Sequence, residues 1–416
     1  MNNLPDIRHN KHKKEAIISM HKPEPTQEAP LWSRNFITIC FSSFFVYMTF
    51  YILAVTLPTF VLENLHGSNQ QIGLVTTVFI IAAVIFRPLT GKWLDELDKK
   101  KIILFSLILF AICSILHLVV TNFYILLLLR FIHGISFGIA ATATSAVVIH
   151  IIPVNRRGEG IGYFSLFMSL AMVIGPFLGL TLMNNFSFSV LFIACFVLAL
   201  LSMVCGMITQ LPTTPAPAKT ASSSWDWKKF IEPKAIPISL AGCVLAFSYG
   251  AISTFISVYA KTIGLEKVAS YFFMVFAAMI LISRPFTGKL FDRKGEHILV
   301  YPGIILFVVG MIWLSQANTA FIFLLTGGII GLGFGALLPS FQALAVRSAP
   351  SHRSGLATGT YFVFFDSGYG LGSYILGIIA AQTNYHTMYL VGGIVVAFTV
   401  VLYYGLHHRK QKVQTA

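Results

Sequence analysis

Long apolar stretches alternate with short polar connections along almost the whole chain. Each stretch is near or above the ~20 residues that a helix needs to cross a bilayer. The pattern therefore predicts an all-α membrane protein with twelve transmembrane helices. The expected spans are residues 35–60, 70–92, 101–120, 124–151, 158–182, 186–208, 236–260, 267–290, 297–316, 319–346, 354–381 and 386–406.

Composition places these stretches in lipid. Of the 416 residues, 56% are hydrophobic and only 11% are charged, which is more apolar surface than a water-soluble core can bury. Residues 1–33 are polar and lack the apolar segment of a cleavable signal peptide, so we expect the first span to direct insertion. The five cysteines lie inside spans without a C-x-x-C pair, and we expect no disulfide framework, metal site or cofactor.

The net charge of +14 is concentrated in the tails and in some of the loops. Lysine and arginine gather in both tails and in every second loop, whereas the alternate loops hold only Lys261 and Lys267. Charge placed in this way sets membrane topology and does not indicate nucleic-acid binding. By the positive-inside rule both termini are cytoplasmic, which requires an even number of spans. We therefore expect a multi-pass protein of the cell (inner or plasma) membrane.

The chain carries an internal duplication. Residues 87–95 (RPLTGKWLD) recur as residues 284–292 (RPFTGKLFD), an offset of 284 − 87 = 197. Proline, alanine, threonine and serine dominate residues 209–235, as in a solvated linker. The expected units are a cytoplasmic tail (1–34), a six-helix half (35–208), the cytoplasmic linker (209–235), a second six-helix half (236–406) and a cytoplasmic tail (407–416).

Parallel repeats related by an axis along the membrane normal are an architecture of secondary transporters. In such proteins the substrate site lies between the halves near the midplane, and rocking of the halves exposes it to alternate sides. The sequence has no Walker-type phosphate loop, no H-E-x-x-H pair and no G-x-S-x-G elbow. We therefore expect transport driven by a gradient and no enzyme activity.

The loops after spans 2 and 8 carry a repeated motif. Residues 91–100 (GKWLDELDKK) and 288–295 (GKLFDRKG) are similar to the G-x-L-x-D-R-x-G-R/K-R/K pattern of the major facilitator superfamily. The resemblance covers nearly the whole chain and implies a loop that latches the two halves on the cytoplasmic side. In the first copy Glu96 and Asp98 replace the expected Arg and Gly, and a role in topology alone is the alternative. The latch candidates are Gly91, Asp95, Gly288, Asp292 and Arg293.

Span 4 contains a charged residue, Arg130. A charge inside a span is costly and normally faces the protein interior or water, which makes Arg130 a functional candidate. The segment from Arg130 to Gly134 resembles the R-x-x-x-G motif of the same superfamily, whose proton-coupled members use the matching arginine in coupling. His133 stands where glutamine is usual. It is a second candidate for coupling, with a buried structural imidazole as the alternative.

Gly175, Pro176 and Gly179 form a G-P-x-x-G pattern in span 5. It resembles the signature of exporters in the superfamily, although Ala171 and Leu180 depart from that signature. Proline bends a helix and glycines four residues apart permit close packing, so helix packing alone is the alternative explanation. The resemblance favours export.

Asp366 is the only carboxylate deep inside a predicted span. Twelve residues separate it from Ser354 (366 − 354), which places it roughly 18 Å into a ~30 Å hydrocarbon layer. A charged carboxylate is costly there unless a cation compensates, so we expect protonation near neutral pH. Drug-exporting relatives often carry an acid in span 1; residues 35–60 contain none, and Asp366 is the natural substitute. A structural acid, bonded to Ser367 or a tyrosine or paired with an arginine, is the alternative.

These patterns predict a proton-coupled exporter of a small organic molecule, either a drug-like compound or a metabolite, that works by alternating access. Its partners are the solute, protons and the lipid bilayer, and no oligomer is required. The first alternative is an importer or symporter of a sugar or another small metabolite with the same fold. The second is a non-transporting membrane sensor, which a large soluble signalling domain would favour; the sequence shows no such domain.

Overall fold

The computed structural model describes residues 30–153, 156–211, 231–350 and 353–409. Within these ranges twelve helices are long and apolar enough to cross a membrane, and no strand is present. The predicted fold class is confirmed. The long helices are α2 (Arg34–Glu63), α3 (Asn69–Glu96), α4 (Lys99–Leu116), α5 (Phe123–Ile151), α6 (Arg157–Asn185), α7 (Phe188–Ile208), α8 (Ile236–Thr262), α9 (Ala269–Lys294), α10 (His297–Leu314), α11 (Ala320–Arg347), α12 (Ser354–Gln382) and α13 (Tyr385–Tyr403).

Short helical turns join some of these elements. They are η1 (His117–Val119), η4 (Pro233–Ala235), η5 (Glu266–Val268) and the π-helical turn η7 (Tyr404–His408).

Polar residues start several helices just before an apolar run. The Ser33 side chain accepts a hydrogen bond from the backbone N–H of Phe36 at 3.2 Å and so caps α2. Ser68 and Gln71 bond each other's backbone N–H in a capping box at the start of α3. These bonds satisfy N–H groups that have no partner within the helix. They fix where each span begins.

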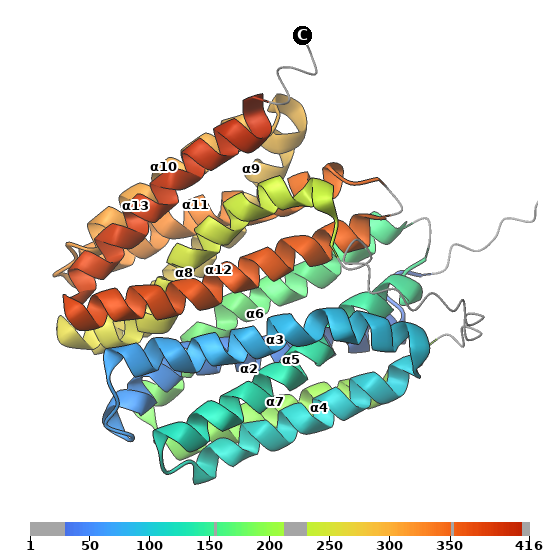
Figure 1. The fold of residues 1–416 in the computed structure, drawn as a ribbon, viewed down its shortest axis with the longest axis horizontal. Helices are drawn as coiled ribbons and strands as arrows, with labels where there is room; N and C mark the ends of the chain where they lie inside the picture. Colours follow the sequence, from blue (N-terminus) through green and yellow to red (C-terminus); the bar gives the residue numbers. More distant parts are fainter. Residues whose placement is uncertain (1–29, 154–155, 212–230, 351–352, 410–416) are drawn as a thin grey trace, which may run out of the picture.

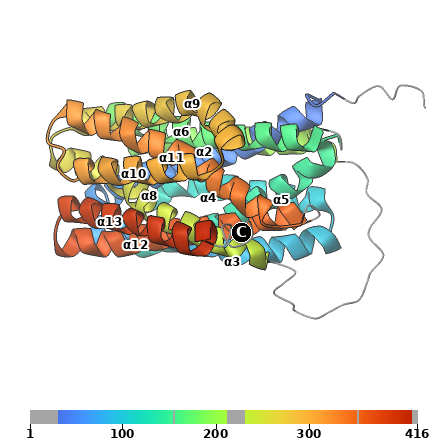
Figure 2. The same cartoon turned by 90° about the horizontal axis from the view of Figure 1, so that it is seen from above.

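The helices form two groups that lie side by side, with their axes along the long direction of the molecule (Figures 1 and 2). Helices α2 to α7 make the first half and α8 to α13 the second. Contacts between the halves join α3 to α12, α2 to α8 and α6 to α9. Because twelve spans separate them, the start of α2 and the end of α13 lie at one end of the bundle, called here the terminal end.

The duplication is visible in the packing of the halves. A Cβ added to Gly134 on α5 would collide with the carbonyl oxygen of Phe79 on α3, and one added to Gly331 on α11 would collide with that of Phe276 on α9. Both the glycines (331 − 134) and their neighbours (276 − 79) are 197 residues apart. Each half thus uses the same close helix crossing, which only a residue without a side chain permits.

Candidate functional site

An ion pair joins the two halves inside the bundle. Arg87 Nη2 on α3 lies 2.5 Å from Asp366 Oδ2 on α12. The two side chains are only 13% and 17% exposed, so both charges are largely removed from solvent. Asp366 therefore has an arginine partner, as one alternative from the sequence had it. Its role as a proton site stays a prediction.

Arg87 was not among the predicted site residues. It opens the repeated segment 87–95, which the sequence placed at the end of span 2 and in the loop. In the structure α3 continues to Glu96, so Arg87 lies nine residues inside the helix (96 − 87). The repeat itself was the available signal, because an arginine within reach of a span requires a partner or water.

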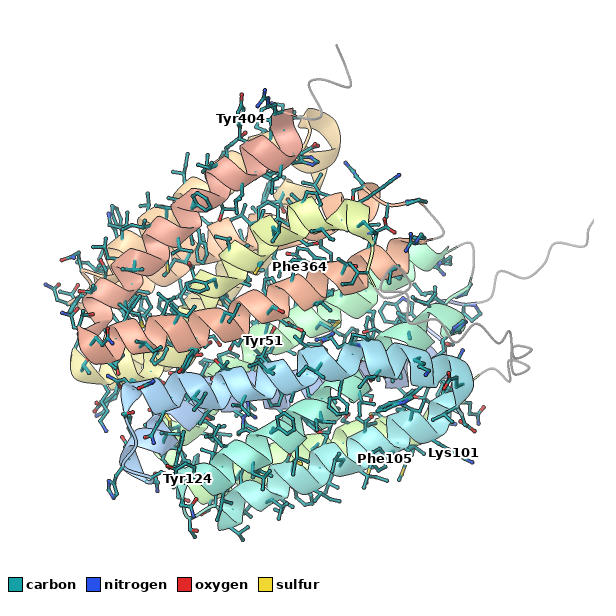
Figure 3. The ribbon with its side chains drawn as sticks, viewed as in Figure 1. Tyr51, Lys101, Phe105, Tyr124, Phe364 and Tyr404 are labelled. Carbon is teal, nitrogen blue, oxygen red and sulfur yellow. The ribbon has the colours of Figure 1, made fainter. Side chains whose placement is uncertain are left out.

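Tyrosines surround the ion pair. Tyr47 on α2 interacts electrostatically with both Arg87 and Asp366. Figure 3 shows Tyr51 where the two halves meet. The neighbouring Phe50 ring lies 4.9 Å from the Tyr51 ring and 6.0 Å from the Tyr369 ring of α12, centre to centre. The Tyr369 hydroxyl donates a hydrogen bond to Ser253 Oγ on α8 at 2.8 Å. The zone between the halves is thus aromatic with a few hydroxyl groups, beside one buried ion pair.

One nitrogen of the Arg87 guanidinium has no hydrogen-bond partner. This atom, Nε, is buried, whereas Nη2 is bonded to Asp366. A buried donor without a partner is unfavourable by about 1–3 kcal/mol and is usually satisfied by water or a ligand. This nitrogen is therefore a candidate donor for a bound solute beside Asp366.

Arg130 and His133 lie together in the core of the first half. Arg130 is 1% exposed, and its guanidinium carbon sits 4.0 Å from the centre of the Phe79 ring. Its Nη1 is 3.5 Å from His133 Nδ1, which must accept because a guanidinium only donates. His133 Nε2 then carries the proton, 3.5 Å from Ser114 Oγ.

The structure does not join this cluster to Asp366 by hydrogen bonds. Among the described residues no carboxylate forms an ion pair with Arg130. Tyr369 is within electrostatic range of both Arg130 and Asp366. The Arg130 and His133 cluster and Asp366 are thus two polar centres that no described hydrogen bond or ion pair connects. A coupling role for Arg130 and His133 stays a prediction.

The side chains of Asp95, Asp292 and Arg293 and the surroundings of Gly288 lie outside the described residues. Gly91 is described, and a Cβ added there would meet no atom within 4 Å. The close approach that a glycine would permit is therefore not made at Gly91 in this structure.

Asp98 shows why the first copy of the loop motif departs from the pattern. Its carboxylate accepts hydrogen bonds from the backbone N–H groups of Lys100 at 2.8 Å and Lys101 at 3.2 Å. It therefore caps the start of α4, where a negative charge also interacts favourably with the helix dipole. An acidic residue replaces glycine here because it begins a helix.

The glycines of span 5 bring α6 against α2. A Cβ on Gly175 would lie 2.8 Å from Tyr51 Cβ, and one on Gly179 would lie 3.2 Å from Ile52 Cα. Pro176 stands inside α6 without ending it. The packing role is therefore present, and the implication for export stays a prediction.

Between Arg87–Asp366 and the end opposite the termini, the halves are sealed along α3 and α12. The Thr77 hydroxyl donates to the carbonyl of Gly370 at 2.6 Å, and a Cβ on Gly73 would collide with the backbone of Ser373. On the other side of the molecule the Asn184 side chain donates to the carbonyl of Glu266 at 3.1 Å. These contacts close the opposite end.

Two cavities lie at this closed end, away from Asp366. One of about 490 Å³ is inside the first half, with Phe60, His117 and Phe188 among its lining residues. The other, of about 210 Å³, lies between α2 and α8. Neither is lined by Asp366 or Arg130, so the chemistry of the ion pair defines the candidate site and cavity size does not.

A duplicated bundle of twelve membrane-spanning helices, with an ion pair buried between its halves, defines the class of secondary membrane transporters. The family model of the Major Facilitator Superfamily matches residues 39–373 and again 302–416. The chain belongs to this superfamily, as its motifs predicted.

Relatives with similar sequences include drug-efflux proteins. The chain is 24% identical over 396 residues to the quinolone resistance protein NorA of Staphylococcus aureus (strain COL), covering 91% of this chain and 98% of NorA. It is 24% identical over 385 residues to the multi-drug resistance efflux pump PmrA of Streptococcus pneumoniae serotype 4 (strain ATCC BAA-334 / TIGR4), covering 88% and 94%. These matches support a multi-pass transporter of the cell membrane.

Solved structures share the fold. A bacterial homologue of the human lysosomal transporter Spinster, inward-facing and unoccupied, has a TM-score of 0.70 at 14% identity and covers 90% of this chain and 95% of its own. The nucleoside transporter NupG has a TM-score of 0.67 at 17% identity and covers 89% and 98%.

Proposed function

We propose that this transporter exports a small organic molecule in exchange for protons by alternating access. The observation that carries the proposal is the Arg87–Asp366 pair, because it is a titratable contact between the two moving halves. The efflux function named for NorA and PmrA supports export and a drug-like or amphipathic substrate. We infer from the lysine and arginine distribution that the terminal end faces the cytoplasm.

The pair links protonation to the contact between the halves. An ionised Asp366 attracts Arg87 and holds α12 to α3. A proton on Asp366 removes that attraction and leaves the arginine charge without a partner, which is unfavourable away from water. Protonation therefore favours separation at this level, and loss of the proton favours closure. That linkage is what an exchanger needs to couple two gradients.

The other predicted residues have roles that fit this cycle. Arg130 and His133 of the first half set the electrostatic field near Tyr369 of the second half. Asp95, near the end of α3, and Asp292, near the end of α9, act as latches at the cytoplasmic end. The motif of Gly175, Pro176 and Gly179 lets α6 move closely against α2. Each role is a proposal that a substitution can test.

The test is transport by the purified protein in liposomes with an imposed pH gradient. The panel should contain amphipathic cations, sugars and metal chelators. The Lys267→Gln variant is the control, because it removes an exposed charge in η5, at the end opposite the termini. An exporter moves one class of compound uphill when protons flow the other way. Uphill movement of solute in the same direction as protons would show the importer alternative, and no movement of any solute under any gradient would favour the sensor.

A further inference from the structure

Helices α2 and α8 meet at the end opposite the termini, where two pairs of polar side chains are in contact. The Thr59 hydroxyl on α2 donates to Ser257 Oγ on α8 at 3.5 Å. Glu63 forms an ion pair with Lys261. Four residues separate Thr59 from Glu63 and Ser257 from Lys261, which is one helical turn, so both contacts lie on the same helix faces.

These contacts lie close to the axis that relates the halves. Each joins residues 198 positions apart (257 − 59 and 261 − 63), one more than the repeat offset of 197. Repeat-related residues can touch only near the axis that exchanges the two halves. The Ser257 hydroxyl also donates to the carbonyl of Val55 at 2.9 Å, one turn deeper on α2. Any separation of the halves at this end must break these bonds.

The contact between α2 and α8 at this end, called here the seam, lies beside a cavity. A cavity of about 210 Å³ is lined by six residues, three from each helix: Thr59, Leu62, Glu63, Val258, Lys261 and Thr262. The side chains of Glu63 and Lys261 are 40% and 54% exposed. An exposed pair of this kind is weak and contributes little to folding. A weak bond at a moving seam is suited to opening and closing.

We propose that Glu63–Lys261, with Thr59–Ser257 beneath it, is the outer gate of the transporter. The proposal rests on alternating access as proposed above, with this end facing outside. In the present structure the gate is closed while Arg87 and Asp366 are paired. Opening of the gate would release the exported solute between α2 and α8.

The ionic character of the gate has a measurable consequence. Salt screens attraction between exposed charges, so high ionic strength outside should favour the open gate. Removal of either charge should have the same effect and should make the gate insensitive to salt. A hydrogen-bonded or apolar seam would respond to neither change.

The experiment measures opening directly and needs no substrate. Spin labels on Ser189→Cys and Asn318→Cys report the distance between the outer ends of the two halves, since both residues are exposed at this end. The background carries Cys205→Ser and Cys243→Ser, because these two cysteines are only partly buried. The full chain is measured in lipid nanodiscs by double electron–electron resonance.

Glu63→Gln and Lys261→Gln should each raise the ratio of open to closed molecules by about 1.5- to 5-fold, the range of an exposed ion pair. The charge-exchanged double variant Glu63→Lys/Lys261→Glu should return the ratio to the wild-type value. Lys267→Gln, which removes another exposed charge at the same end, is the control and should change nothing.

Unchanged distances in both single variants would overturn the gate proposal, as would a double variant that fails to restore closure. Because distances are read without solute or pH gradient, this outcome is separate from the function. A protein that opens as described but moves no solute would contradict the proposed export and leave the gate in place. A protein that moves no solute and whose outer ends keep the same distance in all variants would contradict both the proposed export and the gate.

Discussion

Arg87 on α3 and Asp366 on α12 are 279 residues apart in the sequence and form a 2.5 Å ion pair between the two halves of the transporter. The contact lies between the terminal end and the sealed segment marked by Thr77 and Gly370. A substitution of either charge therefore tests both stability and transport.

Removal of Arg87 alone should destabilise the protein. Arg87→Gln leaves Asp366 without its cation in a site that is largely shielded from water, and loss of one partner of a buried pair typically lowers the free energy of unfolding by about 3–5 kcal/mol. Thermal unfolding in detergent measures this loss. The double variant Arg87→Gln/Asp366→Asn should recover most of it, since no unpaired charge remains. A single variant as stable as wild type would mean that the pair does not form.

Substitution of glycine by alanine should have different effects at close helix crossings and at open positions. Gly134→Ala and Gly331→Ala place a methyl group against a backbone carbonyl, so each should destabilise its half by about 1–3 kcal/mol. Gly162→Ala and Gly359→Ala are matched controls, because a Cβ there meets no atom within 4 Å and alanine favours a helix by roughly 0.5–1 kcal/mol. Thermal unfolding and yield of folded protein are the measurements. Equal effects at all four positions would contradict the described packing.

Topology can be tested with single cysteines in intact cells and an impermeant maleimide. Positions at the terminal end, Asp95, Arg157 and Asp292, should stay unlabelled from outside. Positions at the opposite end, Asn64, Lys261 and Asn384, should label. Strong external labelling of Asp95→Cys would reverse the proposed orientation, and with it the assignment of the outer gate.

The latch proposal predicts a change in transport without a loss of protein. Asp292→Asn should lower the transport rate while expression persists, because a surface pair is worth only about 1 kcal/mol or less to folding. Lys92→Gln is a suitable comparison, since Lys92 forms only a long, exposed contact of 3.8 Å with Glu96. If Asp292→Asn changes neither transport nor the accessibility of the two ends, the motif serves only to set membrane topology.

The spans were predictable because lipid leaves the backbone few choices. A chain that crosses a bilayer must satisfy its N–H and C=O groups internally, so each apolar run of sufficient length becomes a helix. The repeat was predictable because the same residues recur at a constant offset of 197. Glycines at equal offsets, Gly134 and Gly331, mark the same close crossing in each half.

The partner of Asp366 was not predictable from the sequence. Arg87 already fell inside the predicted span 70–92, and the repeat marked it as an arginine that needs a partner or water, but neither observation says which residue is that partner. Pairing over 279 residues also depends on how the halves dock, and so does the contact of Glu63 with Lys261. A local sequence pattern does not determine how the two halves dock, so it does not predict either pair.

The most direct test of proton coupling is uphill transport by Asp366→Asn in liposomes with an imposed pH gradient. Asparagine keeps the shape of the side chain but cannot ionise, so this variant should bind solute and exchange it downhill but should not concentrate it. Asp366→Glu should retain partial coupling, and Lys267→Gln should behave as wild type. Concentration of solute by Asp366→Asn at the wild-type rate would contradict the account, and His133 would then be the next residue to test.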